Sequence, residues 1–499
     1  MLISQDSRLS FEKSRPGREG TTLPKAITPK DTAIQIPERL LRKRPLLFPE
    51  LTEPEAVRHF VSLSKKNYSI DTQFYPLGSC TMKYNPKINE YAAANEKFSQ
   101  VHPLQPIETV QGILSIMYDL EQYLKTIAGM DRFTLQPAAG AHGELTGMML
   151  VRAYHAAKKQ SKRWKVLVPD SSHGTNPASA ALYGYHVVEL KSNARGRVDL
   201  ENLKQHLDED TACLMLTNPN TLGLFEEEII PITKLVHEKG ALLYYDGANL
   251  NPLLGIARPG DMGFDIVHIN LHKTFSTPHG GGGPGSGPVG VKQHLLPFLP
   301  RPLVEKDEKG RFFLDEKADQ SIGRVKTFYG NMGMILRAFV YIRSLGKAGL
   351  LKSSEGAILN ANYLKEKLKP YFPVAIDEPC MHEFVLSIRK SKEIHAGDIG
   401  KRLLEMGFHA PTVHFPLVVE EALMIEPTET ESKETLDQFI AAMKTIAREI
   451  EENPEVILAA PRNLPITRPD EVLAARKPIL CYRDQLREKI LQAEGIPVS

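Results

Sequence analysis

Three polar residues, each following an apolar stretch, could do chemistry together. Lys273 comes after "FDIVHINLH", Asp246 ends "ALLYYD", and His173 follows "WKVLVPDSS". A lysine amine forms a Schiff base with an aldehyde, and an acid can hold a proton on a pyridine nitrogen so that the ring accepts electrons. An imidazole can stack on the face of such a ring. The combination is typical of a site for pyridoxal phosphate.

Each of these residues has a simpler interpretation when it is taken alone. An aspartate after a strand is often a helix cap. His173 could be an ordinary hydrogen-bonded histidine, and Lys273 could lie on the surface. The cofactor site is the favoured interpretation because all three residues occur together and in this order along the chain.

A turn of small residues, Ala138 to Ala141, leads into an apolar helix in "LQPAAGAHGELTGMMLVRAYHAAKK". The free N–H groups at the start of a helix bind anions, so this turn is a candidate phosphate site. The glycines after Lys273 in "HGGGGPGSGPVGV" would let the backbone approach a cofactor closely. They match neither a P-loop nor a dinucleotide fingerprint.

The middle of the chain alternates short apolar runs with helical patterns. Near-continuous apolar strands separated by helices predict an α/β fold with a mainly parallel sheet that is covered on both faces. Functional groups gather at the carboxyl ends of such strands, where the polar residues of this chain fall. The expected strands lie within residues 164–170, 186–190, 212–220, 241–251 and 264–273.

Changes in composition predict four regions. Residues 1–70 read as an extended arm, and residues 71–345 as a large α/β domain with a helical lead-in to about residue 130. Residues 346–455 read as a small α+β domain, and residues 456–499 as a tail that packs on the body. One expected helix ends at Gly129. Another, in the small domain, has an apolar face made of Leu436, Phe439, Ile440, Met443, Ile446 and Ile450.

Charge and cysteine content exclude several classes of protein. The 499 residues include 62 basic and 60 acidic side chains, which leaves a net charge of +2 and does not suggest a nucleic-acid partner. The four cysteines form no C-x-x-C pair, so we expect neither a metal site nor a disulfide framework. No apolar run is long enough to cross a membrane, and the first residues lack a secretory signal. A cytoplasmic protein is expected.

Several long motifs, in order, resemble the glycine decarboxylase P-protein of the glycine cleavage system. They are "FYPLGSCTMKYNP", "LQPAAGAHGE", "DSSHGTNPASA", "TNPNTLGLFE", "YYDGANLN" and "HINLHKTFSTPHGGGGPGSGPVGV". The resemblance runs from about Asp71 to the tail and corresponds to the C-terminal half of the long single-chain P-protein. It implies the second, cofactor-binding subunit of the split bacterial or archaeal form. It also implies a fold type I pyridoxal-phosphate enzyme that pairs with a homologous first subunit, two copies of each.

The resemblance also implies roles for individual residues. Lys273 would carry the cofactor covalently, Asp246 would pair with the ring nitrogen, and His173 would stack on the ring; these three are the expected catalytic residues. The other expected cofactor contacts are Ala139, Gly140, Ala141 and His272 at the phosphate, Ala248 on the other ring face, and Thr217 or Asn218 at the ring hydroxyl or the substrate.

The reaction implied by the resemblance is the decarboxylation of glycine. CO2 is released, and the aminomethyl group passes to the lipoyl arm of the H-protein. In "PLGSCTMKYNP", Ser79, Thr81 and Lys83 are candidates to contact the substrate carboxylate or the phosphate. Cys80 is either a small buried residue or a redox-sensitive thiol. His279 is either a proton shuttle or a loop histidine.

Three other functions stay open. An aminotransferase of the same fold usually uses a C-terminal arginine for the substrate carboxylate, and Arg462 could fill that place. A cysteine desulfurase needs a cysteine in a mobile active-site loop, for which only Cys80 qualifies. A subunit with a purely structural role would have no need of Lys273, Asp246 and His173 together.

Overall fold

The computed structural model describes residues 8–22, 24, 36–42, 48–279, 285–388 and 393–478. The chain divides into two compact units, Met1–Ser69 and Ile70–Ser499, and each is described by itself. Residues 280–284, which hold the predicted glycine run, lie outside the described residues. So does the part of the predicted tail from residue 479 onward.

The described part of the first unit contains short helices and little core. They are α1 (Ser10–Lys13), the 3-10 helix η1 (Glu38–Leu40) and α2 (Glu53–Ser64). Thr52 is the N-cap residue of α2, and its N–H donates to the carboxylate of Glu55 over 3.0 Å. His59 is the buried residue of α2, whereas Phe60 beside it is exposed. The described part of the predicted arm therefore includes the helices α1 and α2.

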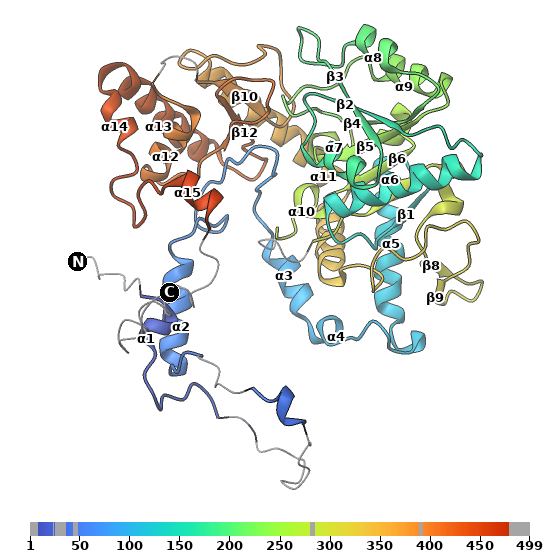
Figure 1. Cartoon of the computed structure of the whole chain (residues 1–499), viewed down its shortest axis with the longest axis horizontal. Helices are drawn as coiled ribbons and strands as arrows, with labels where there is room; N and C mark the ends of the chain where they lie inside the picture. Colours follow the sequence, from blue (N-terminus) through green and yellow to red (C-terminus); the bar gives the residue numbers. More distant parts are fainter. Residues whose placement is uncertain are drawn as a thin grey trace. The chain divides into compact units, whose positions relative to one another are not determined.

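The second unit is built on a seven-stranded sheet (Figure 1). Its strand order is β1-β7-β6-β5-β4-β2-β3, and β7 runs antiparallel to both of its neighbours while the other pairs are parallel. The strands are β1 (Arg132–Thr134), β2 (Lys165–Pro169), β3 (His186–Leu190), β4 (Thr211–Thr217), β5 (Leu242–Gly247), β6 (Ile266–Ile269) and β7 (Val289–Val291).

Both faces of this sheet are covered, as predicted. Successive side chains of β5 point to opposite faces: Leu243 and Tyr245 pack in one core with α5 and α9, and Leu242 and Tyr244 pack in another with α6. Helix α5 ends at Gly129, which has a positive φ of 70°, as the sequence predicted. The helices of this part are α5 (Gln111–Ala128), α6 (Gly140–Ala157), α7 (Thr175–Leu182), α8 (Leu200–His206), α9 (Ile229–Glu238) and α10 (Leu271–Thr274).

Helix α11 (Met332–Leu368) links the large sheet to a smaller C-terminal part and is kinked at Gly346, where φ is 60°. The smaller part has a sheet of β10 (Phe384–Ser387), β12 (Ala422–Ile425) and β11 (Thr412–Val413), in that order. Its own core includes the predicted apolar face of α13 (Lys433–Glu452). The other helices here are α12 (Ala396–Glu405), α14 (Pro454–Leu458) and α15 (Glu471–Arg476).

The remaining elements of the second unit are short. A hairpin of β8 (Leu303–Lys306) and β9 (Phe312–Asp315) stands apart from both sheets. The short helices are α3 (Lys87–Ala94), α4 (Glu96–Ser99), η2 (Ile107–Thr109), η3 (Asn251–Leu253), η4 (Pro259–Met262) and η6 (Gln293–Phe298). Within the described residues, the helices are too short or too polar to span a lipid bilayer.

Candidate active site

Asp246 lies at the carboxyl end of the central strand β5 and is 1% exposed. Oδ2 accepts hydrogen bonds from Nδ1 of His173 (3.0 Å), Nδ2 of Asn176 (2.9 Å) and the hydroxyl of Thr217 (3.2 Å). Oδ1 accepts from the N–H of Ala248 over 2.9 Å. Burial alone would raise the pKa of Asp246, but the neighbouring His268 and His173 hold it below its usual value. The carboxylate is therefore ionised and rigidly held.

His173 follows β2 and is oriented from both sides of its ring. Because the ionised Asp246 can only accept, Nδ1 of His173 carries the proton of that hydrogen bond. Nε2 then accepts from the hydroxyl of Ser79. The ring also lies parallel to that of Phe415, with centroids 6.0 Å apart. These contacts fix one tautomer of the imidazole.

Lys273 lies in α10, directly after β6, and is half-buried. Its ammonium donates a hydrogen bond of 2.7 Å to the carbonyl oxygen of Ser79. Strands β5 and β6 are hydrogen-bonded neighbours, so Asp246 and Lys273 lie at adjacent strand ends. The sheet therefore brings together the three residues that the sequence singled out, with Ser79 between His173 and Lys273.

The segment Gly78–Lys83, here called the 78–83 loop, reaches the strand ends from outside the sheet. Gly78 lies so close to β12 that a Cβ atom there would stand 2.7 Å from the carbonyl oxygen of Met424. Ser79 and Thr81 both have left-handed backbone conformations, with φ of 64° and 48°. Side chains from the smaller part of the unit, Glu383 and Glu426, accept hydrogen bonds from the N–H groups of both residues.

Helix α6 begins at Gly140, and no side chain caps its first turn. Ala139 and Ala141 are exposed on either side of Gly140, so the first N–H groups of the helix are open to an anion. A Cβ atom on Gly287 would lie 2.1 Å from the carbonyl oxygen of Ala139, so this glycine allows two backbone segments to meet at the turn.

His272 provides a second polar group without a partner. Nε2 accepts a long hydrogen bond of 3.5 Å from Nδ2 of Asn270, so Nδ1 carries the proton. Among the described residues, this buried Nδ1–H donor has no acceptor. Burial lowers the pKa of His272 to about 3, so the ring is neutral. A phosphate can accept hydrogen bonds from the N–H groups of an uncapped helix start and from an unpaired imidazole N–H. The residues present therefore fit pyridoxal phosphate.

The other expected cofactor contacts hold the scaffold of the site together. Thr217 and Ala248 both donate to Asp246, and Ala248 is buried. Asn218 is hydrogen-bonded within the protein: its Oδ1 accepts from the N–H of Glu226 (2.9 Å), and its carbonyl accepts from the hydroxyl of Tyr245 (2.5 Å).

Lys83 is fully buried, and its ammonium has four partners. It donates to Glu429 and Asn251 (2.8 Å each), to the carbonyl oxygen of Thr274 (2.8 Å) and to the hydroxyl of Tyr341 (3.1 Å). These contacts use the donors of Lys83 within the protein, so we propose a structural role for Lys83 in place of the expected contact with substrate.

Three further residues named in the sequence have defined surroundings. Burial raises the pKa of the half-buried Cys80 thiol, which makes it a poor nucleophile. His279 donates from Nε2 to the carbonyl oxygen of Cys80 over 2.9 Å, and burial lowers its pKa. Arg462 is exposed, and its backbone N–H donates to Glu405 of α12.

Several residues of the site were missed in the sequence. Asn176 lies three positions after His173, on the first turn of α7, where it reaches the same oxygen of Asp246. His268 lies opposite Asp246 in the register of β6 and β5, and its Nε2 is 3.4 Å from Oδ1 of Asp246. Glu144 on α6 is buried beside Asp246; burial first, and then Asp246, raise the pKa of Glu144 to about 8. The sequence signal for His268 is a polar residue inside the apolar run that leads to Lys273.

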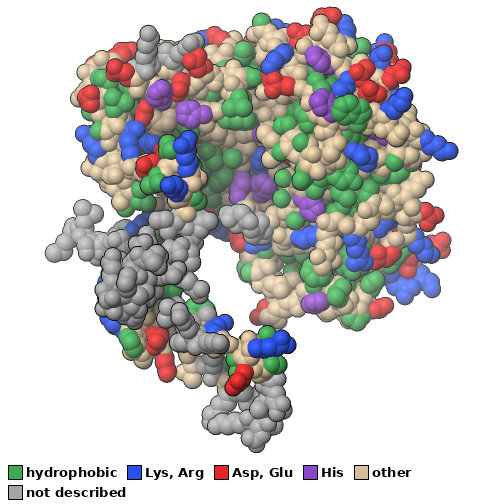
Figure 2. All heavy atoms as spheres, viewed as in Figure 1, with side chains coloured by type: hydrophobic (Ala, Val, Ile, Leu, Met, Phe, Trp, Pro, Cys, Tyr) green, Lys and Arg blue, Asp and Glu red, His purple; other side chains and the backbone are tan. Residues whose placement is uncertain are grey.

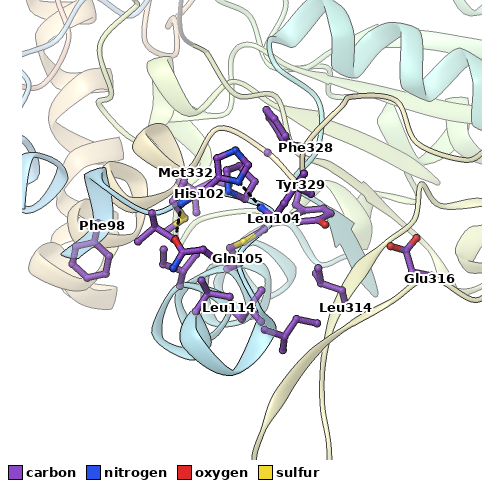
Figure 3. A pocket seen from close by; sticks show the side chains of 18 residues that line it. Phe98, His102, Leu104, Gln105, Leu114, Leu314, Glu316, Phe328, Tyr329 and Met332 are labelled. Carbon is purple, nitrogen blue, oxygen red and sulfur yellow. Dashed lines mark hydrogen bonds between the residues drawn. The ribbon is translucent and has the colours of Figure 1, made fainter. Parts of the chain in front are cut away.

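Two hollows are visible on this unit. In Figure 2 a recess separates the part that carries α12 to α14 from the part that carries the large sheet, and histidine side chains lie in it. A different cavity, of about 350 Å³, lies between α5 and the segments before and after it, including His102, Leu104 and Tyr329 (Figure 3). Its lining includes none of the candidate catalytic residues, so it is separate from the strand-end site.

Two family models match the chain: Aminotransferase class-V over residues 146–301, and Glycine dehydrogenase, C-terminal domain, over residues 353–465. The crystal structure of a glycine decarboxylase (P-protein) of the glycine cleavage system, in inhibitor-bound form, has a TM-score of 0.69 at 23% identity, covering 83% of this chain and 93% of that chain. A cysteine desulfurase from Thermococcus onnurineus NA1 has a TM-score of 0.59 at 14% identity, covering 76% of this chain and 95% of that chain. The fold is that of the fold type I pyridoxal-phosphate enzymes, with a smaller C-terminal α+β part, as predicted.

Sequence relatives narrow this class to one family. A probable glycine dehydrogenase (decarboxylating) subunit 2 from Caldanaerobacter subterraneus subsp. tengcongensis is 58% identical over 482 residues, covering 96% of this chain and 99% of the relative. The protein of that name from Pyrococcus furiosus is 57% identical over 492 residues, covering 97% of this chain and 98% of the relative. The chain belongs to the family of glycine dehydrogenase (decarboxylating) subunit 2, which confirms the resemblance seen in the sequence.

Proposed function

We propose that this chain is the cofactor-binding subunit of a glycine decarboxylase of the glycine cleavage system. Pyridoxal phosphate is held covalently on Lys273, glycine loses its carboxylate as CO2, and the aminomethyl group passes to the lipoyl arm of the H-protein. The observation that carries the proposal is that Asp246 and Lys273 follow the neighbouring strands β5 and β6, and that His173, which follows β2, is hydrogen-bonded to Asp246, in a chain of this family.

Each of these residues has one task in the proposed reaction. Bound at this site, pyridoxal phosphate supplies an electron sink for the pair of electrons that glycine keeps when CO2 leaves. Lys273 would hold the cofactor through its side-chain amine. Asp246, kept ionised by His268 and His173, holds a proton on the ring nitrogen so that the sink stays effective. His173 would lie against the cofactor ring, with its imidazole held by Asp246 and Ser79.

The first turn of α6 is the proposed phosphate site. Ala139, Gly140 and Ala141 supply backbone N–H groups, and the unpaired Nδ1–H of His272 supplies one more donor. Thr217 supports Asp246, and Ala248 lines the buried floor next to it. For Asn218 we propose a supporting role, through its hydrogen bonds with Glu226 and Tyr245.

The 78–83 loop is the proposed substrate side of the site. The hydroxyl of Ser79 is hydrogen-bonded to His173, and the carbonyl oxygen of Ser79 is hydrogen-bonded to Lys273. An incoming glycine would therefore meet Ser79 next to Lys273. Thr81 is engaged with Glu426, and Lys83 with Glu429, so both support the loop from behind.

The proposed partners follow from the family. The relatives are named subunit 2, which supports a homologous first subunit as partner, and we propose two copies of each. Lipoylated H-protein accepts the aminomethyl group, and the cytoplasm is the proposed location. No metal ion or nucleic acid is required by this reaction.

The decisive test is turnover with defined partners. The chain, a first subunit and lipoylated H-protein should release CO2 from carboxyl-labelled glycine, and release should stop when H-protein carries no lipoyl group. Amino-group transfer to a 2-oxo acid would favour an aminotransferase, and release of sulfide from cysteine would favour a desulfurase. Normal turnover with a Lys273→Ala chain would mean that this chain is only a structural partner.

A further inference from the structure

A buried cluster of three titratable side chains lies behind the 78–83 loop. It consists of His382 and Glu383, just before β10, and Glu426, just after β12, and all three are 0% exposed. One donor or acceptor atom of each lies within 4.8 Å of the others. Nε2 of His382 is 3.8 Å from Oε1 of Glu383 and 3.9 Å from Oε1 of Glu426. We call these residues the acid cluster.

The acid cluster holds the 78–83 loop by its N–H groups. The N–H of Ser79 donates to Oε2 of Glu383 over 2.7 Å. The N–H of Thr81 donates to Oε2 of Glu426 (2.8 Å), and the hydroxyl of Thr81 donates to Oε1 of the same carboxylate (2.6 Å). Ser79 and Thr81 are the two residues of the loop with left-handed backbones, a conformation that costs free energy for residues other than glycine. The two carboxylates offset this cost at those two positions.

The loop in turn positions two catalytic candidates. The carbonyl oxygen of Ser79 accepts from Lys273, and the hydroxyl of Ser79 donates to His173. If Ser79 moved, Lys273 would lose its acceptor and His173 would lose the donor that fixes its tautomer. The acid cluster therefore acts on Lys273 and His173 through one residue.

Two ionised carboxylates this close in a buried place would repel each other. Burial raises the pKa of Glu383 and raises that of Glu426 to about 7. The other groups that face the cluster are Lys273, Glu429 and His173, and His382 is neutral because burial lowers its pKa to about 3. Lys273 is the cation that faces both glutamates, and Lys83 already neutralises Glu429.

We propose that Glu383 and Glu426 share a single proton and, as positioning residues, hold the 78–83 loop against Lys273 and His173. The proton lies on Glu383, because Glu426 accepts two short hydrogen bonds and is the better placed carboxylate. Glu383 accepts one short bond from Ser79, and a longer one of 3.3 Å from Nδ2 of Asn249. The effect on catalysis rests on the proposed function, whereas the hold on the loop does not.

Amide hydrogen exchange of the full chain tests the hold without any activity measurement. In Glu426→Gln, the peptide that contains Ser79 and Thr81 should exchange about tenfold faster than in the wild type, since one of its charged acceptors is gone. In Glu383→Gln, whose amide imitates a protonated acid, the change should stay below about threefold. Equal rates in all variants, or equal acceleration in both, would overturn the proposal.

Glu431→Gln is the matched control. Glu431 lies five positions after Glu426, burial also raises its pKa to about 7, and within the described part of the chain its carboxylate makes no hydrogen bond to the loop. Exchange of the loop peptide should be unchanged in this variant. If it accelerated as in Glu426→Gln, the loss of any buried carboxylate nearby would explain the result, and the proposal would be wrong.

The wild type alone offers a second test that needs no folded variant. Protection of the loop peptide, corrected for the intrinsic exchange rate, should fall at alkaline pH, where the shared proton leaves Glu383, whose pKa burial raises well above its usual value, and the two carboxylates repel each other. Constant or rising protection at alkaline pH would contradict the shared proton. If the loop behaves as predicted but pyridoxal phosphate attaches to a lysine other than Lys273, the proposed function fails and the hold on the loop stands.

Discussion

The ammonium of Lys273 donates a 2.7 Å hydrogen bond to the carbonyl oxygen of Ser79, which lies 194 positions earlier in the chain. The hydroxyl of the same Ser79 donates to His173, and His173 donates to Asp246. One residue of a strained loop thus joins the nucleophile of the site to its buried acid. This chain of contacts makes the outcome of single substitutions predictable.

Asp246→Asn should remove the negative charge while it keeps the shape of the side chain. With a neutral amide, the ring nitrogen loses the group that holds its proton, so kcat should fall about 10² to 10³-fold. Steady-state turnover of glycine, together with the affinity for pyridoxal phosphate, measures this, and the affinity should change much less than kcat.

Asp265→Asn is the control for that substitution. Asp265 is also buried, but it precedes β6 at the other end of the strand, where it accepts from the N–H of Leu243 over 2.7 Å and from His237 over 2.9 Å. This variant should lose thermal stability and keep its kcat. A similar loss of kcat in both variants would show that the charge of Asp246 has no special role.

Glu144→Gln should change how stability depends on pH. Because the pKa of Glu144 is raised from 4.5 to about 8, the folded protein binds a proton that the unfolded chain has released. The free energy of unfolding should therefore fall as pH rises between about 4.5 and 8. Over the same pH range, the glutamine variant should lose less stability than the wild type. Melting temperatures at about pH 5 and pH 8.5 measure this, and parallel curves for the two proteins would contradict it.

Gly287→Ala should disturb the proposed phosphate site. The added methyl group would lie 2.1 Å from the carbonyl oxygen of Ala139, a backbone atom that cannot rotate away. We expect the dissociation constant of pyridoxal phosphate to rise about tenfold, in line with the usual cost of overpacking. Gly112→Ala in α5 is the control, because a methyl group there meets nothing within 4 Å, and it should leave the affinity unchanged.

Lys83→Met separates a structural role from contact with substrate. The substitution leaves Glu429 buried without its cation, so the free energy of unfolding should drop by about 3 to 5 kcal/mol. Adding Glu429→Gln should restore part of this loss. Lys87→Met, which breaks the exposed pair with Asp71, should cost less than about 1 kcal/mol. Full stability of Lys83→Met with a raised KM for glycine would instead support contact with substrate.

The sequence was sufficient for the fold and for the residues at strand ends. Apolar runs and helical patterns predicted the parallel sheet, because strands buried on both faces leave a continuous signal. Asp246 and Lys273 end such runs, so their meeting at one edge follows from the topology alone. The end of α5 at Gly129, which has a left-handed backbone, was also predictable, because a glycine directly after an apolar helical pattern indicates the end of a helix.

The acid cluster could not be predicted in the same way. Glu383 and Glu426 flank strands of the smaller sheet, and they meet the 78–83 loop only across more than 300 positions of sequence. The ion pair of Lys83 with Glu429 was not predictable either, because the two residues are far apart in the sequence and meet only in the folded chain. Contacts between distant segments leave no local pattern.

The most direct measurement of the central claim is reduction of the purified protein with borohydride, followed by mass mapping of its peptides. We predict a pyridoxyl group on the peptide that contains Lys273, and its loss in Lys273→Ala after pyridoxal phosphate has been added to both proteins. A pyridoxyl group on another lysine of the wild type, or none even with added pyridoxal phosphate, would contradict the proposed site.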